Sequence, residues 1–165
     1  MDIKLQRKLF RKYPYIFENR KRPSSETRMC DGITCGNGWY QLIDDLCRKL
    51  KAIMNVTDCY IVASQVKEKF AGLRFYIDQV KFSHDSNCSS WKDQNNIREI
   101  ISDIIYHAHC DSFKVCEECG KYRDKSPQIG NYVYAMCDKC FKKFSNKRKF
   151  VCPEIQFSRD VESDW

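Results

Sequence analysis

Four cysteines towards the C-terminal end of the chain have the type and spacing of a metal site. Two C-x-x-C pairs are separated by 17 residues, and Gly120 follows the first pair; the four residues are Cys116, Cys119, Cys137 and Cys140. Four thiolates at this spacing are typical of a closed tetrahedral zinc site. We therefore expect a structural Zn²⁺ with no open position for a water nucleophile. Two redox-active pairs, or cysteines without metal, are the alternatives.

A second candidate site lies in residues 64–77, which have the pattern of a tight β-hairpin. Two runs rich in Val, Ile, Phe and Tyr flank Ala71-Gly72, and a two-residue loop with glycine second suits a hairpin turn. In this register Glu68 lies opposite Phe75 on the apolar face, where an ionised carboxylate needs a partner. A one-residue bulge would instead move Glu68 to the solvent side. The outward face carries three cations and a ring, namely Lys67, Lys69, Arg74 and Tyr76.

The loop Gly36-Asn37-Gly38 leads into Trp39 at the start of a predicted helix. Helix entry is the favoured interpretation, since no Lys-Ser/Thr follows and neither the Walker nor the dinucleotide pattern fits. Binding of an anion by the free N–H groups is one alternative. Another joins the two candidate stretches, because a helix packed on the hairpin could bring these N–H groups or the Trp39 indole to Glu68.

Apolar periodicity predicts two amphipathic helices. From Trp39 to Met54 apolar residues recur every three or four positions, and a similar stripe follows a cap at Asp93 or Asn95 and continues to Ala108. Residues 59–66 are predicted as a first strand before the hairpin. The expected fold is α+β, a small core of two amphipathic helices packed on a β-hairpin, with a C-terminal four-cysteine zinc ribbon or treble-clef-like module.

Charge is concentrated at the two ends of the chain, whose net charge is +7. Residues 1–28 carry nine Lys or Arg against three acids, and residues 142–149 add five with none. Such blocks suit nucleic acid, an acidic protein partner or solubility alone. We expect a basic N-terminal segment over 1–28, favoured as a solvated leader over an arm that orders on binding. This segment is expected to be followed by a core over 29–112, a zinc-binding module over 113–150 and an acidic tail over 151–165.

The composition indicates a cytoplasmic protein. No apolar run approaches the roughly 20 residues of a membrane-spanning helix, and the region after Met1 lacks the apolar core of a secretory signal. The 11 cysteines are therefore read as metal ligands and reduced core thiols. His84 and Cys88 have ligand-like spacing, but they fall in a predicted polar loop. Three residues that end the second helix are interpreted as structural rather than catalytic or metal-binding: His107, His109 and Cys110.

Three stretches together carry a resemblance. They are Cys35-Gly-Asn-Gly-Trp39-Tyr-x-Leu-Ile-Asp-x-Leu-Cys47, Ala63-Ser-Gln-Val-Lys-Glu-Lys-Phe70-x-Gly-Leu-Arg-Phe-Tyr76 and the two C-x-x-C pairs. In this order they resemble a widespread family of uncharacterised small proteins encoded by bacteriophages, prophages and bacteria, over about Tyr13 to Cys140. Asn37 stands where the family usually has Asp, and Ala71 where it usually has Gly. The resemblance picks out Gly36, Gly38, Trp39, Lys67, Glu68, Lys69, Arg74 and Tyr76 as its pattern.

These features lead to an expected function. We expect a zinc-stabilised binding protein of phage or mobile-element type that acts on nucleic acid or on a host protein in the bacterial cytoplasm, as a regulator or an anti-defence factor. Its basis is the hairpin's outward face, where cations contact phosphate and a ring stacks.

Two alternatives belong to other classes of function. One is a metal-dependent nuclease or phosphoesterase with Glu68 as base or metal ligand, but Lys69 directly follows Glu68 and points to the opposite face of the strand. The sequence therefore favours a protein that is not an enzyme. The other is an anion- or nucleotide-binding protein that uses the loop from Gly36 to Gly38.

Overall fold

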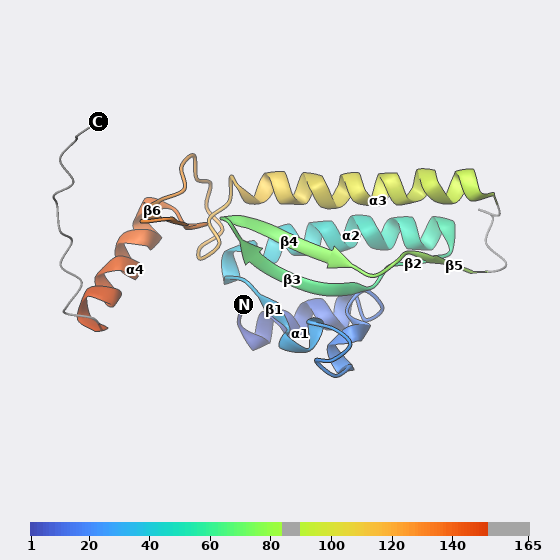
Figure 1. Ribbon diagram of the computed structural model, residues 1–165, viewed down its shortest axis with the longest axis horizontal. Helices are drawn as coiled ribbons and strands as arrows, with labels where there is room; N and C mark the ends of the chain where they lie inside the picture. Colours follow the sequence, from blue (N-terminus) through green and yellow to red (C-terminus); the bar gives the residue numbers. More distant parts are fainter. Residues whose placement is uncertain (84–89, 152–165) are drawn as a thin grey trace, which may run out of the picture.

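Two long helices and a β-hairpin make up the body of the protein. The computed structural model describes residues 1–83 and 90–151. Helices α2 (Tyr40–Thr57) and α3 (Trp91–Ser112) lie side by side and antiparallel, next to the hairpin of β3 (Ala63–Lys69) and β4 (Gly72–Ile77) (Figure 1). The predicted α+β class, with two helices packed on a hairpin, is confirmed.

The remaining elements are short. They are α1 (Ile3–Lys12), β1 (Ile33–Thr34), β2 (Cys59–Tyr60), β5 (Lys81–Phe82), β6 (Gln128–Ile129), β7 (Tyr132–Val133), α4 (Asp138–Val151) and 3₁₀ turns over Glu18–Lys21, Met29–Asp31 and Asn37–Trp39. Strand β1 pairs in parallel with β3, which pairs with β4, while β2–β5 and β6–β7 are separate antiparallel pairs. The single strand predicted over residues 59–66 is therefore split, because its two parts pair with different partners.

The apolar stripes of α2 and α3 form the core that the periodicity predicted. Ile43, Leu46 and Leu50 are buried along one side of α2, and Trp39 is buried just before the helix begins. Burial of such large apolar side chains is the main favourable contribution to folding. On α3 the buried positions are Ile97, Ile101 and Ala108.

The N-terminal cap of α3 differs from the prediction. Ser90 caps the helix, and its Oγ accepts the backbone N–H of Asp93 at 3.1 Å. The predicted cap residues Asp93 and Asn95 instead lie inside the helix. Ser90 satisfies a backbone donor that the first turn leaves free, as N-cap residues do.

The basic N-terminal segment is part of the core, so its interpretation as a solvated leader is wrong. Leu9, Tyr13, Ile16 and Phe17 are buried. Leu9 lies on the buried side of α1 and the other three follow the end of that helix, while Arg11 and Lys12 between them are exposed. The nine arginines and lysines of residues 1–28 made the apolar residues of this segment hard to recognise in the sequence.

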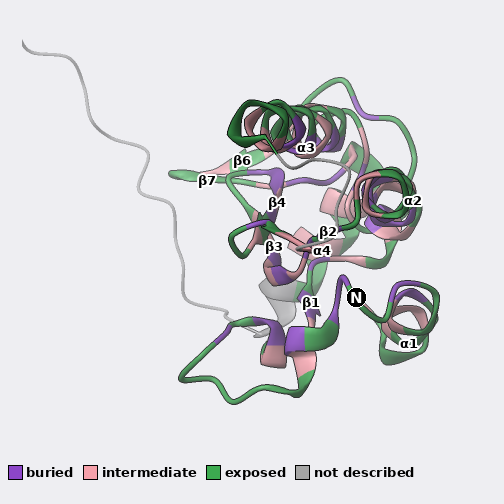
Figure 2. Cartoon of the chain, turned by 90° about the vertical axis from the view of Figure 1, so that its right-hand side faces the viewer, coloured by how far each residue is buried: buried purple, intermediate pink, exposed green. Residues whose placement is uncertain are grey.

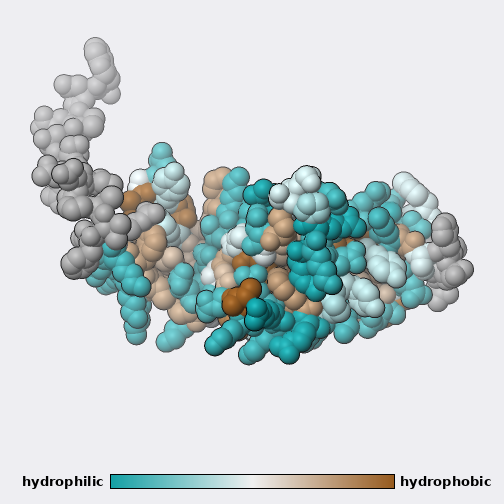
Figure 3. Space-filling view, turned by 90° about the horizontal axis from the view of Figure 1, so that it is seen from below, coloured by the Kyte–Doolittle hydropathy of each residue, from teal (hydrophilic) through white to brown (hydrophobic). Residues whose placement is uncertain are grey.

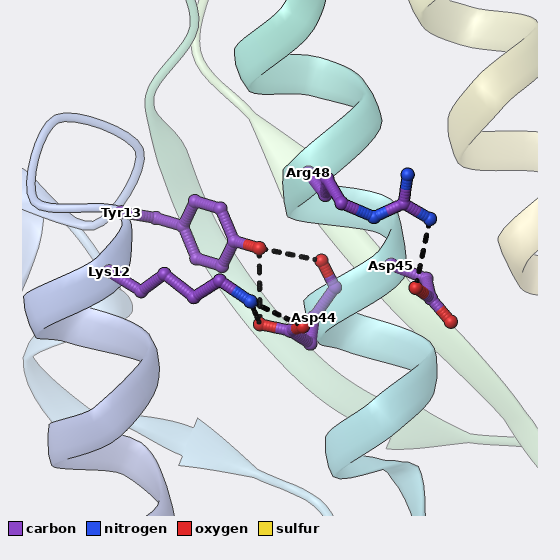
Figure 4. Close-up of polar contacts among 5 residues, drawn as sticks. All are labelled: Lys12, Tyr13, Asp44, Asp45 and Arg48. Atoms are coloured by element: carbon purple, nitrogen blue, oxygen red, sulfur yellow. Dashed lines mark hydrogen bonds and ion pairs between the residues drawn. The ribbon is translucent and has the colours of Figure 1, made fainter.

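A polar contact fastens α1 to α2 (Figure 4). Lys12 Nζ lies 2.7 Å from Asp44 Oδ2, and the Tyr13 hydroxyl donates to the Asp44 carbonyl oxygen at 3.0 Å. The hydrogen bond to Asp44 raises the pKa of Lys12 above its ordinary value. On the next residue of α2, the Asp45–Arg48 pair at 3.1 Å stays on the surface and makes no contact between helices.

The hairpin turn lies one residue earlier than predicted. Phe70 and Ala71 form it, with φ of 56° and 58°, and Glu68 pairs with Leu73 instead of Phe75. Both turn residues are left-handed, as a type I′ turn requires. Glu68 keeps its place on the apolar side, because the alternation within β3 is unchanged by the shift.

Gly72 belongs to β4 and not to the turn. A Cβ atom at this position would lie 2.8 Å from Cε1 of His109 and 2.9 Å from Cζ of Phe113, both on or just after α3. The glycine therefore allows α3 to approach the strand closely. Gly72, which the sequence pattern placed in the turn, is thus needed for close packing of β4 against α3.

The sheet is covered unequally. Figure 2 shows α2 and α1 on one side of the hairpin and α3 above it, while the opposite side is covered by none of these three helices. Seen from below, the surface is mostly hydrophilic, with scattered hydrophobic residues (Figure 3). In the part of the chain that the structure describes, no helix combines the length and apolarity needed to cross a bilayer.

Phe70→Asn should stabilise the protein by about 1 kcal/mol, because Asn adopts the left-handed conformation more readily than Phe. Phe70 is 71% exposed, so little packing is lost. Urea unfolding measures the change. Phe70→Ala is the control, since it removes the ring without favouring a positive φ; equal stability of the Asn and Ala variants would contradict the turn assignment.

Candidate metal centre and cationic hairpin face

The four predicted metal ligands converge on one point. The sulfur atoms of Cys116, Cys119, Cys137 and Cys140 all lie within 4.8 Å of one another. The Cys119 and Cys137 sulfurs are 3.8 Å apart. A tetrahedron with metal–sulfur bonds of about 2.3 Å has edges of about 3.8 Å, so the arrangement can hold one metal ion with four thiolates.

Local backbone geometry positions these sulfurs. Cys116 and Cys119 lie in the turn after α3, here called the knuckle (Cys116–Gly120). Cys137 lies just before α4, and Cys140 lies in its first turn. Gly120 has a φ of +72°, and its N–H donates to the Cys116 carbonyl oxygen at 2.9 Å. A positive φ of this size favours glycine. The chain can therefore reverse tightly around the sulfurs.

Backbone N–H groups also favour the thiolates. The hydrogen bond from the backbone of Cys140 lowers the pKa of Cys137 to about 7. Burial raises the pKa of Cys116, while hydrogen bonds from the backbones of Cys137 and Cys119 oppose that effect. Metals bind the deprotonated sulfur, so these donors support ligation.

The loop from Gly36 to Trp39 packs directly on the knuckle. The N–H of Gly36 donates to Glu117 Oε1 at 2.7 Å, and the N–H of Gly38 donates to the Glu117 carbonyl oxygen at 2.6 Å. The indole N–H of the buried Trp39 donates to the Val115 carbonyl oxygen at 3.0 Å. These N–H groups were predicted to bind an anion or Glu68. They donate instead to Glu117 in the knuckle and to Val115, the residue before it.

Both glycines of this loop are required by close approach. A Cβ atom at Gly36 would lie 2.7 Å from Cγ of Glu117, and one at Gly38 would lie 2.7 Å from the Glu117 carbonyl oxygen. Real Cβ contacts are essentially never that short. Asn37 faces outward, where its side-chain oxygen accepts the Asp2 N–H at 2.7 Å. The spacing of the two glycines therefore reflects the close packing of this loop on the knuckle.

Arg123 joins the metal centre to the hairpin, and sequence reasoning missed it. The residue is 2% exposed, and its guanidinium donates to the carbonyl oxygens of Ala71 at 2.8 Å, Ser112 at 3.2 Å and Val115 at 3.1 Å. It also donates to the Ser126 hydroxyl. Burial lowers its pKa, whereas the negative charges of Cys116, Glu117 and Glu68 oppose that shift. The stretch around it, Lys121 to Gln128, is almost entirely charged and polar and has no apolar periodicity, so its spacing gave no signal.

Glu68 caps the hairpin turn. Its Oε1 accepts the Ala71 N–H at 2.6 Å, and the Ala71 carbonyl oxygen accepts from Arg123. The neighbouring Glu117 has its pKa raised to about 7 by burial, opposed by the Gly36 N–H. Among residues 1–83 and 90–151, the four cysteines are the one group of three or more possible metal ligands that lie together. Glu68 is therefore outside the candidate metal site.

The outward face of the hairpin places each of its three cations against a ring. Lys67 Nζ lies 5.7 Å from the centroid of Tyr76, and Lys69 Nζ lies 5.1 Å from that of Phe70. Arg74 Nη1 lies 2.9 Å from Nε2 of His109. Within the described part of the chain, none of the three cations forms an ion pair. Their charge is thus not offset by a neighbouring carboxylate there.

Helix α3 continues this face with a row of aromatic side chains. Tyr106 is 62% exposed, and its ring centroid lies 6.4 Å from that of His109, which lies 4.8 Å from that of Phe113. His109 Nδ1 lies 3.0 Å from the Leu73 carbonyl oxygen. In the tautomer with the proton on Nδ1, this nitrogen donates to the Leu73 carbonyl oxygen and Nε2 accepts from Arg74. The spacing of 106, 109 and 113 on one helical face could have revealed the row.

The other predicted cysteine and histidine positions play no part in this cluster. Cys35, Cys47 and Cys59 are buried and form no disulfide, while Cys30 and Cys110 are half-buried and likewise form none. Burial raises the pKa of Cys35 to about 12. The predicted pair of His84 and Cys88, Cys152 and the rest of the acidic tail lie outside the described residues.

Gly38→Ala should reduce the free energy of unfolding by about 3 kcal/mol, because the added methyl forces the loop away from the knuckle. Urea unfolding measures the loss. Gly130→Ala is a matched control in the β6–β7 turn, where an added Cβ meets nothing within 4 Å but φ is +56°. Only the strain of about 1 kcal/mol is expected there. Similar losses in both variants would contradict the close docking.

Comparison of the chain with protein-family models, with curated proteins and with solved structures found no match.

Proposed function

We propose that the protein is a zinc-stabilised binding protein that takes up a single strand of nucleic acid on the hairpin's outward face and the adjoining side of α3. The observation that carries this proposal is that Lys67, Lys69 and Arg74 lie against aromatic or imidazole rings and not against carboxylates. Proteins that bind single strands combine cations along the backbone with rings on which bases stack.

Zinc is the metal that best suits the four cysteines. Four thiolates in a closed tetrahedral arrangement are typical of structural zinc. The order of knuckle, β6–β7 hairpin and α4, which carries the last cysteine, supports a treble-clef-like module. The metal would fix the knuckle through Cys116, Cys119, Cys137 and Cys140 and would leave no position for a reacting water.

A single strand suits this surface better than a duplex. The rings of Tyr76, Tyr106 and Phe113 are exposed and spread over two elements. Bases can stack on such rings only where they are free of a partner strand. The exposed rings and the cations between them would therefore contact bases and phosphates in alternation.

The structure gives the enzymatic alternative no support. The Glu68 carboxylate bonds to the Ala71 N–H on the inner side of the hairpin, whereas Lys67 and Lys69 lie on the outer side. The anion-binding alternative needs free donors, and the N–H groups of Gly36 and Gly38 are bonded to Glu117. A phage or mobile-element role, with a host protein as a further partner, rests on the sequence resemblance.

Purified protein should contain one zinc ion per chain, measured by elemental analysis. Removal with a chelator should lower the unfolding temperature by about 10 °C or more, because metal binding contributes directly to folding. Cys119→Ser should lose the metal. Cys30→Ser, at a free half-buried thiol, is the control and should retain it. Full metal content in Cys119→Ser would contradict the assignment.

Replacing Lys67 and Arg74 together by Ala should weaken binding of a labelled oligonucleotide by about 10- to 100-fold. Loss of two phosphate contacts should also reduce the slope of log affinity against log salt by about 1.4. Fluorescence anisotropy at several salt concentrations measures both quantities.

The matched control replaces Lys49 and Lys51 by Ala, which removes the same charge from exposed positions of α2. Equal weakening in both double variants would show a general charge effect and contradict the binding face. Failure of the wild-type protein to bind single-stranded DNA or RNA at low salt would reject the proposed function altogether.

A further inference from the structure

A groove extends the hairpin's outward face towards the N-terminal segment. Its volume is about 590 Å³, and residues 24–28 form one wall. The other wall is the start of β3 with the end of β4, including Ser64, Lys67 and Tyr76. Sites for small ligands commonly have volumes of about 300 to 1,000 Å³, so the groove can hold one nucleotide.

One hydrogen bond fixes the first wall to the second. The hydroxyl of the buried Thr27 donates to the Ser64 carbonyl oxygen at 3.0 Å and accepts the Met29 N–H at 3.1 Å. Ser64 is the extra residue where the register between β3 and β4 shifts. Bulges of this kind bend a strand and often lie beside functional sites. The groove is therefore built by specific contacts of the loop with an irregular part of the strand.

The groove carries the chemistry of a phosphate site. Ser24, Ser25, Arg28 and Lys67 line it. Glu26 also lines it, but its carboxylate lies 3.6 Å from Arg22, which offsets its charge. The charge of Arg28 is offset in the same way by Asp31 at 3.1 Å, so Lys67 is the lining cation that forms no ion pair in the described part of the chain. Hydroxyls and cations without a dominant acid favour a bound anion.

The groove is also continuous with the proposed binding face. Lys67 and Tyr76 line the groove, and the same two side chains form a cation–ring pair on the hairpin. Tyr76 is 45% exposed, so its ring is open to a base. A strand lying on the hairpin would thus reach the groove without leaving the surface.

We propose that this groove binds one backbone phosphate of the nucleic-acid strand, held by Arg28, Lys67 and the hydroxyls of Ser24 and Ser25, while the adjoining base stacks on Tyr76. The proposal rests on the proposed function and adds a subsite to it. It also assigns a role to the basic segment of residues 20–28, which carries four cations and one acid.

The test places a negative charge in the groove. Ser25 is exposed, so Ser25→Glu should leave the fold intact and weaken binding of a 12-nucleotide fluorescein-labelled single strand by about tenfold through repulsion of the phosphate. Ser25→Gln, which has the same size without the charge, should bind within about twofold of the wild type. Ala52→Glu, at an exposed position of α2, adds the same charge elsewhere and should also bind within about twofold.

Two outcomes separate the subsite from the binding face. If the wild type binds and the double variant of Lys67 and Arg74 does not, but Ser25→Glu binds as tightly as Ala52→Glu, the subsite is wrong and the binding face stands. If the wild type binds no single strand at low salt, the subsite and the proposed function are both wrong. Cross-linking of Tyr76 to a photoreactive base in the strand, lost in Ser25→Glu, would support the subsite.

Discussion

The contact between two stretches of backbone, Gly36–Gly38 and the knuckle Cys116–Gly120, determines how the rest of the protein is arranged. The Gly38 N–H donates to the Glu117 carbonyl oxygen and the Gly36 N–H donates to the Glu117 carboxylate, so the loop lies in close contact with the knuckle at both glycines. This contact fixes the start of α2 beside the end of α3, at the end of the two-helix core where the hairpin turns (Figure 1). A metal held by the knuckle would therefore stabilise the core as well as its own module.

The hairpin separates two sets of charges by the alternation of its residues. Glu68 points inward, where Glu117 and the buried Arg123 share a low-dielectric region, and Arg123 reaches the turn through the Ala71 carbonyl oxygen. Lys67 and Lys69 point outward to rings and solvent. The inner set connects the region beside the metal centre to the turn, and the outer set forms the face that we propose binds nucleic acid. A strand of alternating charge can thus serve structure and binding at once.

Sequence patterns predicted the parts of this structure that depend on regular spacing. The period of α2 and α3 predicted their buried sides, and the two C-x-x-C pairs predicted the sulfur cluster. The glycines were harder to interpret, because a glycine needed for close approach looks the same as one needed for a turn or an anion site. Gly72 and Gly38 were both of the first kind. Arg123 and Glu117 escaped prediction because their partners are backbone groups far away in sequence, which no local pattern encodes.

Hydrogen exchange with and without metal tests most directly whether the metal centre supports the hairpin through the knuckle. We expect chelation to accelerate exchange at the Gly38 amide, the Trp39 indole and the Ala71 amide together, while amides in the middle of α2 stay protected. The Ala71 amide is the decisive probe, because it lies in the turn, where Arg123 joins the Ala71 carbonyl oxygen to that of Val115, the residue before the knuckle. Unchanged protection of Ala71 after complete metal removal would show that the metal centre does not support the hairpin turn.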